Sequence, residues 1–346
     1  MPGLSLDALS VLFVWTAVAV YTLAFVAYAV DLARRSDLAV KAKDAVDARV
    51  LVAAGGGEAG PDPVRTPVAP GGLEVAPGDR PRYLWARMGT SLTVLAFLFH
   101  VGGTVLRGIE AARVPWSNNY EFALTGTLLI VAVYLGVLFR YDLRFLGSFI
   151  TGMTAVFLGG AALNYYVVVT PLADPLKSVW LVIHVFVASL ATAFFALAFA
   201  LSVLQLMQAR RERLAVAATL APTASTGETS RRTGPRFLRT LPDADALESL
   251  AYRFAIIGFI FWTFTLIAGA IWANDAWGRY WGFDTKEVWT FVVWVLYAGY
   301  IHARATRGWR GTRSAWLSIV GFSAVIFNFT IVNQFFKGLH AYSGLS

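Results

Sequence analysis

The chain lacks cysteine entirely and has few charged residues. None of its 346 residues is Cys, and only 14% are Asp, Glu, Lys or Arg, against roughly 25% in an ordinary soluble domain. Without a thiol the chain cannot itself reduce a disulfide or carry a thiol-bound intermediate, so any thiol chemistry must belong to a partner. The low charge, together with 57% hydrophobic residues and a mean hydropathy of +0.60, indicates a membrane protein.

Several common motifs are also missing. The sequence has no Walker pattern and no dinucleotide-binding glycine pattern, so nothing indicates nucleotide-driven transport. It has no HExxH motif and no His-rich cluster, which argues against a site for a hard metal ion. We find no internal repeat. The function must therefore come from features of the membrane part itself.

Long apolar runs are what the chain has instead. A helix needs about 20 apolar residues to cross a hydrocarbon core of about 30 Å. The sequence therefore predicts an all-α polytopic membrane protein with about eight transmembrane helices. The eight runs are 8–30, 86–106, 121–139, 146–167, 179–206, 253–273, 288–303 and 316–335.

The basic residues predict how the chain is oriented. No basic residue precedes the first run and the segment DLARR follows it, which is typical of an uncleaved anchor whose N-terminus lies outside. Since Lys and Arg concentrate on the cytoplasmic side, we expect both termini outside a cytoplasmic membrane. The net charge of +8 then reflects topology and requires no nucleic acid, although binding to anionic headgroups is an alternative. Only six of the 29 basic residues fall on the outer side: Arg107, Arg113, Lys177, Arg279, Lys286 and Lys337.

Two predicted cytoplasmic segments are rich in Gly, Pro, Ala, Thr and charge. They have too few apolar residues to offset the entropy of ordering, so we expect disordered linkers at 36–84 and 209–250. These linkers divide the rest of the chain into an N-terminal transmembrane anchor (1–35), transmembrane helices two to five (85–208) and helices six to eight with an outer loop (251–346).

Four histidines are the candidate ligands. His184 lies near the outer end of the fifth run and His340 follows the eighth, so both are expected near the outer face. Two neutral imidazoles are what a low-spin haem iron accepts as axial ligands. His302 belongs to the inner half of the seventh run, and His100 to the outer half of the second. For a single intramembrane histidine, a hydrogen bond to a neighbouring helix is the common alternative, and it stays open for both.

Residues 277–289, WGRYWGFDTKEVW, lie between two predicted spans and interleave large aromatic and charged side chains. A belt of aromatic residues at the membrane interface would account for Trp277 and Trp281. It would not account for Asp284, Lys286 and Glu287 at intervals between the aromatic residues. A broad aromatic surface is, however, what a porphyrin requires. The stretch is therefore the candidate haem-binding loop.

This stretch and its continuation, WGRYWGFDTKEVWTFVVWVLYAGYIHAR, resemble the tryptophan-rich WWD signature of haem-handling proteins. From about residue 85 onward the chain resembles the system II cytochrome c assembly family called CcsA or ResC, or CcsB in some bacteria. VPWSNNYEF at 114–122 is similar to the family's outer-loop motif PxSNxYE, and GLHAYSG at 338–344 to its GLHSYxG. The family's WxWDPKE is WGFDTKE here, with Phe283 and Thr285 replacing Trp and Pro, which puts only the rigidity of the loop in doubt.

The resemblance implies a ligand set for haem b. His184 and His340 match the two outer histidines that ligate the iron, and His302 matches a third histidine within the membrane, while His100 has no firm counterpart. Charge alone suggests that Arg279 and Lys286 pair with the propionates, and that Asp284 and Glu287 orient those cations or the backbone. The expected haem-binding residues of the loop are Trp277, Arg279, Tyr280, Trp281, Phe283, Asp284, Lys286, Glu287 and Trp289.

The resemblance also implies a function. Haem would cross the cytoplasmic membrane and become covalently attached to the CxxCH motifs of apocytochrome c, and the chain would be an enzyme only as a subunit of that cytochrome c synthase. The implied partners are a ResB-type membrane protein, apocytochrome c and a thiol-reducing thioredoxin-like protein. Two alternatives stay open. One is a b-type cytochrome anchor that binds permanent haem between His100 and His184, which lie at a similar depth; the other is haem export without ligation.

Overall fold

The computed structural model describes residues 5–55, 84–172, 174–219, 235–306, 308–336 and 338–339. Within these residues the protein is helical and contains no β-strand, as the apolar runs predict. The long helices are α1 (Leu6–Gly55), α2 (Leu84–Ala111), α3 (Asn119–Leu138), α4 (Gly147–Asn164), α5 (Val179–Thr219), α7 (Ala244–Trp277), α8 (Thr285–Thr306) and α9 (Thr312–Phe327). The short ones are η1 (Arg144–Leu146), η2 (Asp174–Lys177), η3 (Arg236–Thr240), the π-helical turn η4 (Asn328–Val332) and α10 (Asn333–Phe335).

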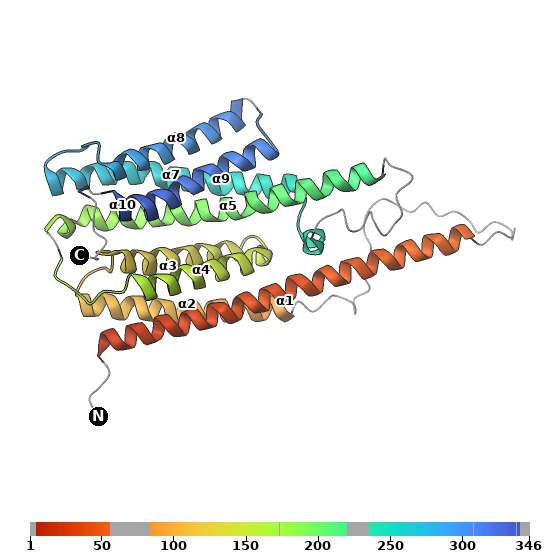
Figure 1. Ribbon diagram of the computed structural model, residues 1–346, viewed down its shortest axis with the longest axis horizontal. Helices are drawn as coiled ribbons and strands as arrows, with labels where there is room; N and C mark the ends of the chain where they lie inside the picture. Colours follow the sequence, from red (N-terminus) through yellow and green to blue (C-terminus); the bar gives the residue numbers. More distant parts are fainter. Residues whose placement is uncertain are drawn as a thin grey trace.

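The long helices form two bundles that lie side by side (Figure 1). In the N-terminal bundle α1 packs on α2 and α4, and α3 packs on α4; in the C-terminal bundle α5 packs on α7 and α9, and α8 packs on α9 and α7. The main contact between the bundles is α3 against α5. A single large apolar cluster runs through both bundles, and it includes Tyr21, Leu124, Phe195 and Tyr297. A smaller cluster lies at one end, beside the start of α5 and the end of α7.

Seven of the described helices are long and apolar enough to cross a membrane. They coincide with seven of the eight predicted spans and support a multi-pass membrane protein. The remaining predicted span, 288–303, is also a helix, α8, but the polar residues at its first turn and His302 and Arg304 near its end shorten its apolar part. The number of eight crossings and the side on which the termini lie therefore stay predictions.

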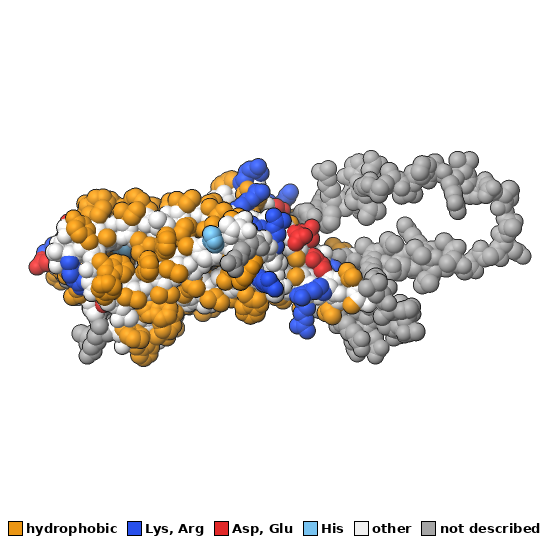
Figure 2. Space-filling view, turned by 90° about the horizontal axis from the view of Figure 1, so that it is seen from above, with side chains coloured by type: hydrophobic (Ala, Val, Ile, Leu, Met, Phe, Trp, Pro, Cys, Tyr) orange, Lys and Arg blue, Asp and Glu red, His pale blue; other side chains and the backbone are white. Residues whose placement is uncertain are grey.

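The surface agrees with a lipid environment. Hydrophobic side chains cover most of the visible face along the helices, whereas the charged side chains gather towards the ends (Figure 2). Large apolar residues that point away from the bundles, such as Leu98, Val156 and Ile260, are 60%, 70% and 61% exposed. In water such a surface would cost free energy in proportion to its apolar area, whereas in a bilayer it contacts lipid chains.

The helices extend further than the apolar runs. Helix α1 continues to Gly55 and α5 to Thr219, and both η3 and the first residues of α7 fall within 209–250. These stretches were expected to be linkers because hydropathy detects only apolar residues. Ala, Leu, Lys and Arg are good helix formers regardless of hydropathy, so a helix that begins in the membrane can continue beyond it. Residues 56–83 and 220–234, the remainder of the predicted linkers, lie outside the described residues.

The α7–α8 loop, residues 278–284, lies at one end of the bundles, which we call the loop end. The starts of α1, α3 and α5 and the ends of α2 and α4 lie at this same end (Figure 1). Hydrogen bonds join these termini, for example from Ser178 before α5 to Asp275 near the end of α7. The motif at 114–122 and the WWD-like stretch therefore share one end of the molecule.

Candidate functional site

A glycine ends helix α7 and begins the aromatic loop. The helix ends at Trp277, and Gly278 follows it with a φ of +70° and donates its N–H to the Asn274 carbonyl at 2.9 Å. This left-handed conformation strongly favours glycine and is a common way to end a helix. The chain reverses direction here, and residues 279–283 lie at the surface of the loop end.

Glu287 fixes the other end of the loop. Its Oε2 accepts the backbone N–H groups of Gly282 at 2.8 Å and Asp284 at 3.1 Å. Asp284 immediately precedes helix α8 and Glu287 is the third residue of that helix, which is the geometry in which a glutamate caps a helix start. Glu287 therefore orders the loop even though Thr285 replaces the proline of the family's pattern. Its carboxylate is directed at the backbone rather than at the exposed face.

The loop aromatic residues divide into an exposed set and an inward set. Tyr280, Trp281 and Phe283 are 62%, 37% and 79% exposed, and the rings of Trp281 and Phe283 meet edge to face at 6.1 Å. Phe283 has a φ of +57°, which is uncommon for a residue with a side chain. Trp277 instead packs on Trp272 at 4.9 Å, and Trp289 packs on Phe327 at 4.4 Å within the bundle. Three rings are thus available to a flat apolar ligand.

The loop cations lie close to the backbone. The guanidinium of Arg279 occupies the space beside Gly282 where a Cβ would otherwise stand. Lys286, which precedes the predicted span 288–303, donates from Nζ to Asn333 Oδ1 at 2.5 Å. Burial lowers the pKa of the Lys286 ammonium to about 8, and the nearby Asp284 carboxylate offsets part of that shift. Arg279 lies in the loop and Lys286 in the first turn of α8 that follows it, and Lys286 loses its charge as the pH rises through about 8.

The chain returns to this loop after α10. The carboxylate of Asp284 lies against Gly338, and residues 284–286 share a small cavity of about 10 Å³ with Asn333, Phe336 and Gly338. His340 itself lies outside the described residues. In the sequence His340 follows Gly338 by two positions.

His184 is held by helix α7. Its Nδ1 lies 2.9 Å from the Thr265 carbonyl oxygen, and because a carbonyl can only accept, this nitrogen carries the proton. The lone pair is then on Nε2, the nitrogen that can coordinate a metal. The imidazole stacks on Trp272 with a centroid distance of 5.8 Å and an interplanar angle of 19°. Gly269 makes room for the ring, since a Cβ there would come 2.7 Å from His184 Cε1.

His302 and His100 lie in different surroundings. His302 is exposed on α8, two residues before Arg304. His100 is fully buried in the N-terminal bundle. Its Nε2 donates to the Leu124 carbonyl at 2.9 Å, and Nδ1 faces the Tyr21 hydroxyl at 3.4 Å. Both ring nitrogens of His100 are thus engaged by the protein, as the hydrogen-bonding interpretation expects.

The described residues contain no group of three His, Asp or Glu side chains that could hold a metal ion. His184 therefore belongs to no such group within the described residues. The sequence did not predict the residues that orient His184, namely Thr265, Gly269 and Trp272. They lie 81 to 88 positions later in the chain and meet His184 only because α7 packs on α5.

Comparison with known proteins assigns the family. Residues 116–340 match the family described as cytochrome C assembly protein. The cytochrome c biogenesis protein CcsA of Guillardia theta is 33% identical over 268 residues, which cover 75% of this chain and 86% of that protein. CcsA of Prochlorococcus marinus is 32% identical over 254 residues, 69% of this chain and 78% of that protein. CcsA of Gloeobacter violaceus is 30% identical over 296 residues, 75% of this chain and 87% of that protein.

The match to the family begins at Trp116 and ends at His340, so it includes the aromatic loop, His184 and His302. Together with the membrane-crossing helices, these comparisons show that the chain belongs to the cytochrome c assembly protein family, that of the CcsA proteins, and that its role is in cytochrome c biogenesis.

Proposed function

We propose that the protein receives haem b from the cytoplasmic side of the cytoplasmic membrane and holds it outside between His184 and His340 for transfer to apocytochrome c. The observation that carries this proposal is the fixed tautomer of His184, which lies near the start of α5. The Thr265 carbonyl holds the proton on Nδ1, and Trp272 packs on one face of the imidazole. A neutral histidine oriented in this way is suited to bind haem iron through Nε2.

The remaining parts of the loop end fit haem as a substrate. Tyr280, Trp281 and Phe283 offer exposed rings that can stack on a porphyrin. Arg279 and Lys286 supply the positive charge that two propionates need. The return of the chain to Asp284 at Gly338 supports His340 as the second axial ligand, because His340 follows Gly338 by only two residues in the sequence.

The attachment chemistry is largely a matter of positioning. In thioether formation a cysteine S–H of the CxxCH segment adds across a haem vinyl group, so an S–C bond forms and the hydrogen goes to the neighbouring vinyl carbon. No residue of this chain needs to form a covalent bond. Its contribution is to hold the haem with the vinyl groups accessible to the two thiols. A thiol-reducing thioredoxin-like partner would keep those thiols reduced, and a ResB-type protein would complete the synthase.

The alternative of a b-type cytochrome anchor is disfavoured by His100. Such an anchor needs two histidines with coordinating nitrogens at one depth. Both nitrogens of His100 are within hydrogen-bonding distance of Leu124 or Tyr21, and the residue lies in the other bundle from His184. Haem export without ligation remains the second candidate, because it would use the same outer site.

The experiment that tests the proposal is covalent transfer. The protein is purified with its membrane neighbours, loaded with haem, and incubated with a reduced CxxCH peptide; the product is measured as peptide-bound haem that resists acid extraction. We expect transfer from the parent complex and none from a complex that carries His184→Gly. Loss of haem to solution without any peptide adduct would favour export, and haem that cannot be removed would favour a permanent cytochrome.

A further inference from the structure

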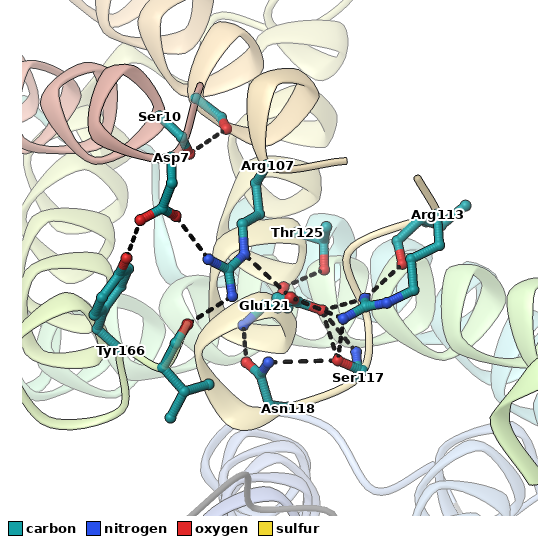
Figure 3. A network of polar contacts seen from close by, with 12 residues as sticks. Asp7, Ser10, Arg107, Arg113, Ser117, Asn118, Glu121, Thr125 and Tyr166 are labelled. Carbon is teal, nitrogen blue, oxygen red and sulfur yellow. Dashed lines mark hydrogen bonds and ion pairs between the residues drawn. The ribbon is translucent and has the colours of Figure 1, made fainter. Parts of the chain in front are cut away.

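A buried ionic cluster ties the loop end of the N-terminal bundle together (Figure 3). Arg107 at the end of α2 has no exposed side-chain surface, and its guanidinium donates to Asp7 of α1 at 2.9 Å, to Glu121 of α3 at 3.1 Å and to the Val167 carbonyl at 2.7 Å. Three helices and the segment after α4 thus meet at one side chain. Removing one member would leave a buried charge without its partner, which is costly.

The same ionic cluster fixes the conformation of the loop between α2 and α3. Glu121 Oε2 accepts from Arg113 Nη1 at 2.7 Å, and from the backbone N–H and hydroxyl of Ser117 at 2.9 and 3.0 Å. Asn118 caps α3 by accepting the N–H of Glu121 at 2.9 Å. Figure 3 shows these contacts converging on Glu121. The backbone on the C-terminal side of Trp116 is therefore fixed by several hydrogen bonds.

Trp116 extends from this loop into the neighbouring bundle. It is 8% exposed, and its indole donates to Thr125 Oγ1 at 2.7 Å. Its ring belongs to the smaller apolar cluster, together with Leu181 and Val185 of α5 and Trp272 of α7. Leu181 and Val185 flank His184 along α5, and Trp272 stacks on the imidazole. Trp116 thus belongs to the N-terminal bundle and packs among the residues that surround His184.

We propose that Trp116 is a positioning residue that fixes the ring plane of His184 through the cluster formed with Trp272. The inference rests on the proposed function, in which His184 binds haem iron. The hydrogen bond to Thr265 sets the tautomer, but it still allows the imidazole to tilt about that bond. The smaller apolar cluster restricts this tilt, because its member Trp272 packs on one face of the imidazole. Neighbours that orient a metal-binding histidine affect the metal as well as the histidine.

The test compares tryptophans at opposite ends of the molecule. Trp116→Ala, Trp116→Phe and a control, Trp85→Ala, are purified with their membrane neighbours and loaded with haem b. Trp85 lies at the start of α2 beside Arg34, away from the loop end. The readouts are the low-spin electron paramagnetic resonance g values and the reduction potential of the bound haem, with circular dichroism as a check on folding. Haem iron is sensitive to its axial ligands in both readouts.

We expect Trp116→Ala to shift both the g values and the potential, Trp116→Phe to return both towards the parent, and Trp85→Ala to leave both unchanged. A simple packing role would lower the yield of folded protein without moving the spectrum of the haem that is bound. Unchanged g values and potential in folded Trp116→Ala would overturn the inference. Equal shifts in Trp85→Ala would do the same, because they would indicate a general loosening of the bundles.

A milder variant covers the case in which Trp116→Ala does not fold. Thr125→Val removes the acceptor of the indole hydrogen bond and preserves the volume, so it should produce a smaller shift in the same direction; no shift would overturn the inference. The proposed function has a separate control. If His184→Gly leaves the haem spectrum of the parent unchanged, His184 is not a ligand and both proposals fail. If His184→Gly changes the spectrum and the variants of Trp116 and Thr125 do not, only the positioning role fails.

Discussion

At the scale of single residues, His184 is the side chain whose surroundings are best defined. The sequence predicts it as a ligand from its place near the outer end of a span and from the family resemblance. Neither source predicts its orientation. The Thr265 carbonyl and the Trp272 ring belong to a helix that begins far along the chain, and only the packing of α7 on α5 brings them to the imidazole. The sequence could therefore single out His184 as a candidate, but it could not predict the atoms that orient its ring.

Replacing His184 with Gly should remove an axial ligand. We expect haem content to fall by roughly tenfold or more, and added imidazole to restore part of it because imidazole can occupy the vacated space. Measurement is by the absorption spectrum of the purified complex with and without imidazole. Full haem content and cytochrome assembly in this variant would contradict the assignment.

Lys286 should make haem binding depend on pH. Its pKa is lowered by burial to about 8, so the ammonium is present below that value and is lost as pH rises through it. If it pairs with a propionate, haem affinity should fall by about tenfold between pH 7 and pH 9, the equivalent of losing one charge-assisted hydrogen bond.

The control for this prediction is Lys286→Arg, which stays charged over the whole range. Haem titrations of the two proteins, followed by absorbance, should give a sloping profile for the parent and a flatter one for the variant. Identical profiles would mean that Lys286 does not pair with a propionate and only donates to Asn333. Arg279 would then be the loop cation left to pair with a propionate.

At the scale of secondary-structure elements, the positions of the helices were easier to predict from the sequence than the contacts between their side chains. All eight apolar runs are helices, because a backbone in lipid must satisfy its own hydrogen bonds. The extension of α1 and α5 was missed, since hydropathy ends where the polar residues begin. The π-helical turn η4, which precedes Asn333, was also missed. A π-helical turn differs from an α-helical turn by one residue in the spacing of its hydrogen bonds, and hydropathy does not detect that difference. The turn nevertheless determines how Asn333, which contacts Lys286, is positioned.

The packing of α5 on α7 supplies a further prediction. Gly269→Ala would place a methyl group 2.7 Å from His184 Cε1, and this is too close for two carbon atoms. Either the imidazole or the helix must move, at a cost of about 1–3 kcal/mol. We expect a folded protein with reduced haem content and a weaker low-spin haem signal in its absorption spectrum.

Gly299→Ala is the matched control for this change, because no atom lies within 4 Å of a Cβ placed at Gly299 of α8. Absorption spectra and thermal unfolding of both variants should show the haem defect only at position 269. A haem defect of the same size in Gly299→Ala would mean that the membrane helices tolerate no added methyl group, and the effect at Gly269 would then carry no information about His184.

At the scale of the whole molecule, His184 and His302 belong to one bundle. His184 lies on α5 and His302 on α8, while the N-terminal bundle contributes a buried His100 whose nitrogens are engaged. The resemblance could not say which helices would pack together. The two-bundle arrangement places the exposed His302 on a helix whose main contacts among the described elements are with α9, α7 and η4.

This arrangement leads to the last prediction, which concerns the direction of haem travel. His302 lies roughly 21 Å along α8 from the outer end of its predicted span, and its side chain is exposed. Since His100, His184 and His340 are all expected nearer the outer face, we expect any second ligand at that level to come from another polypeptide such as a ResB-type partner. Arg304, two residues further, is held by Glu248 at 3.1 Å, which fixes the end of the helix that presents His302.

We therefore expect His302→Ala to leave the outer site intact but to deprive it of haem in cells, because delivery is lost and final binding is not. The measurement compares haem content after expression with uptake by the purified variant. Haem offered to the purified variant should restore the spectrum of the His184 site, whereas the same addition to His184→Gly should not. If His302→Ala acquires as much haem in cells as the parent does, the inner histidine is not on the route, and its place on an exposed face of α8 must serve contact with lipid or with a partner instead.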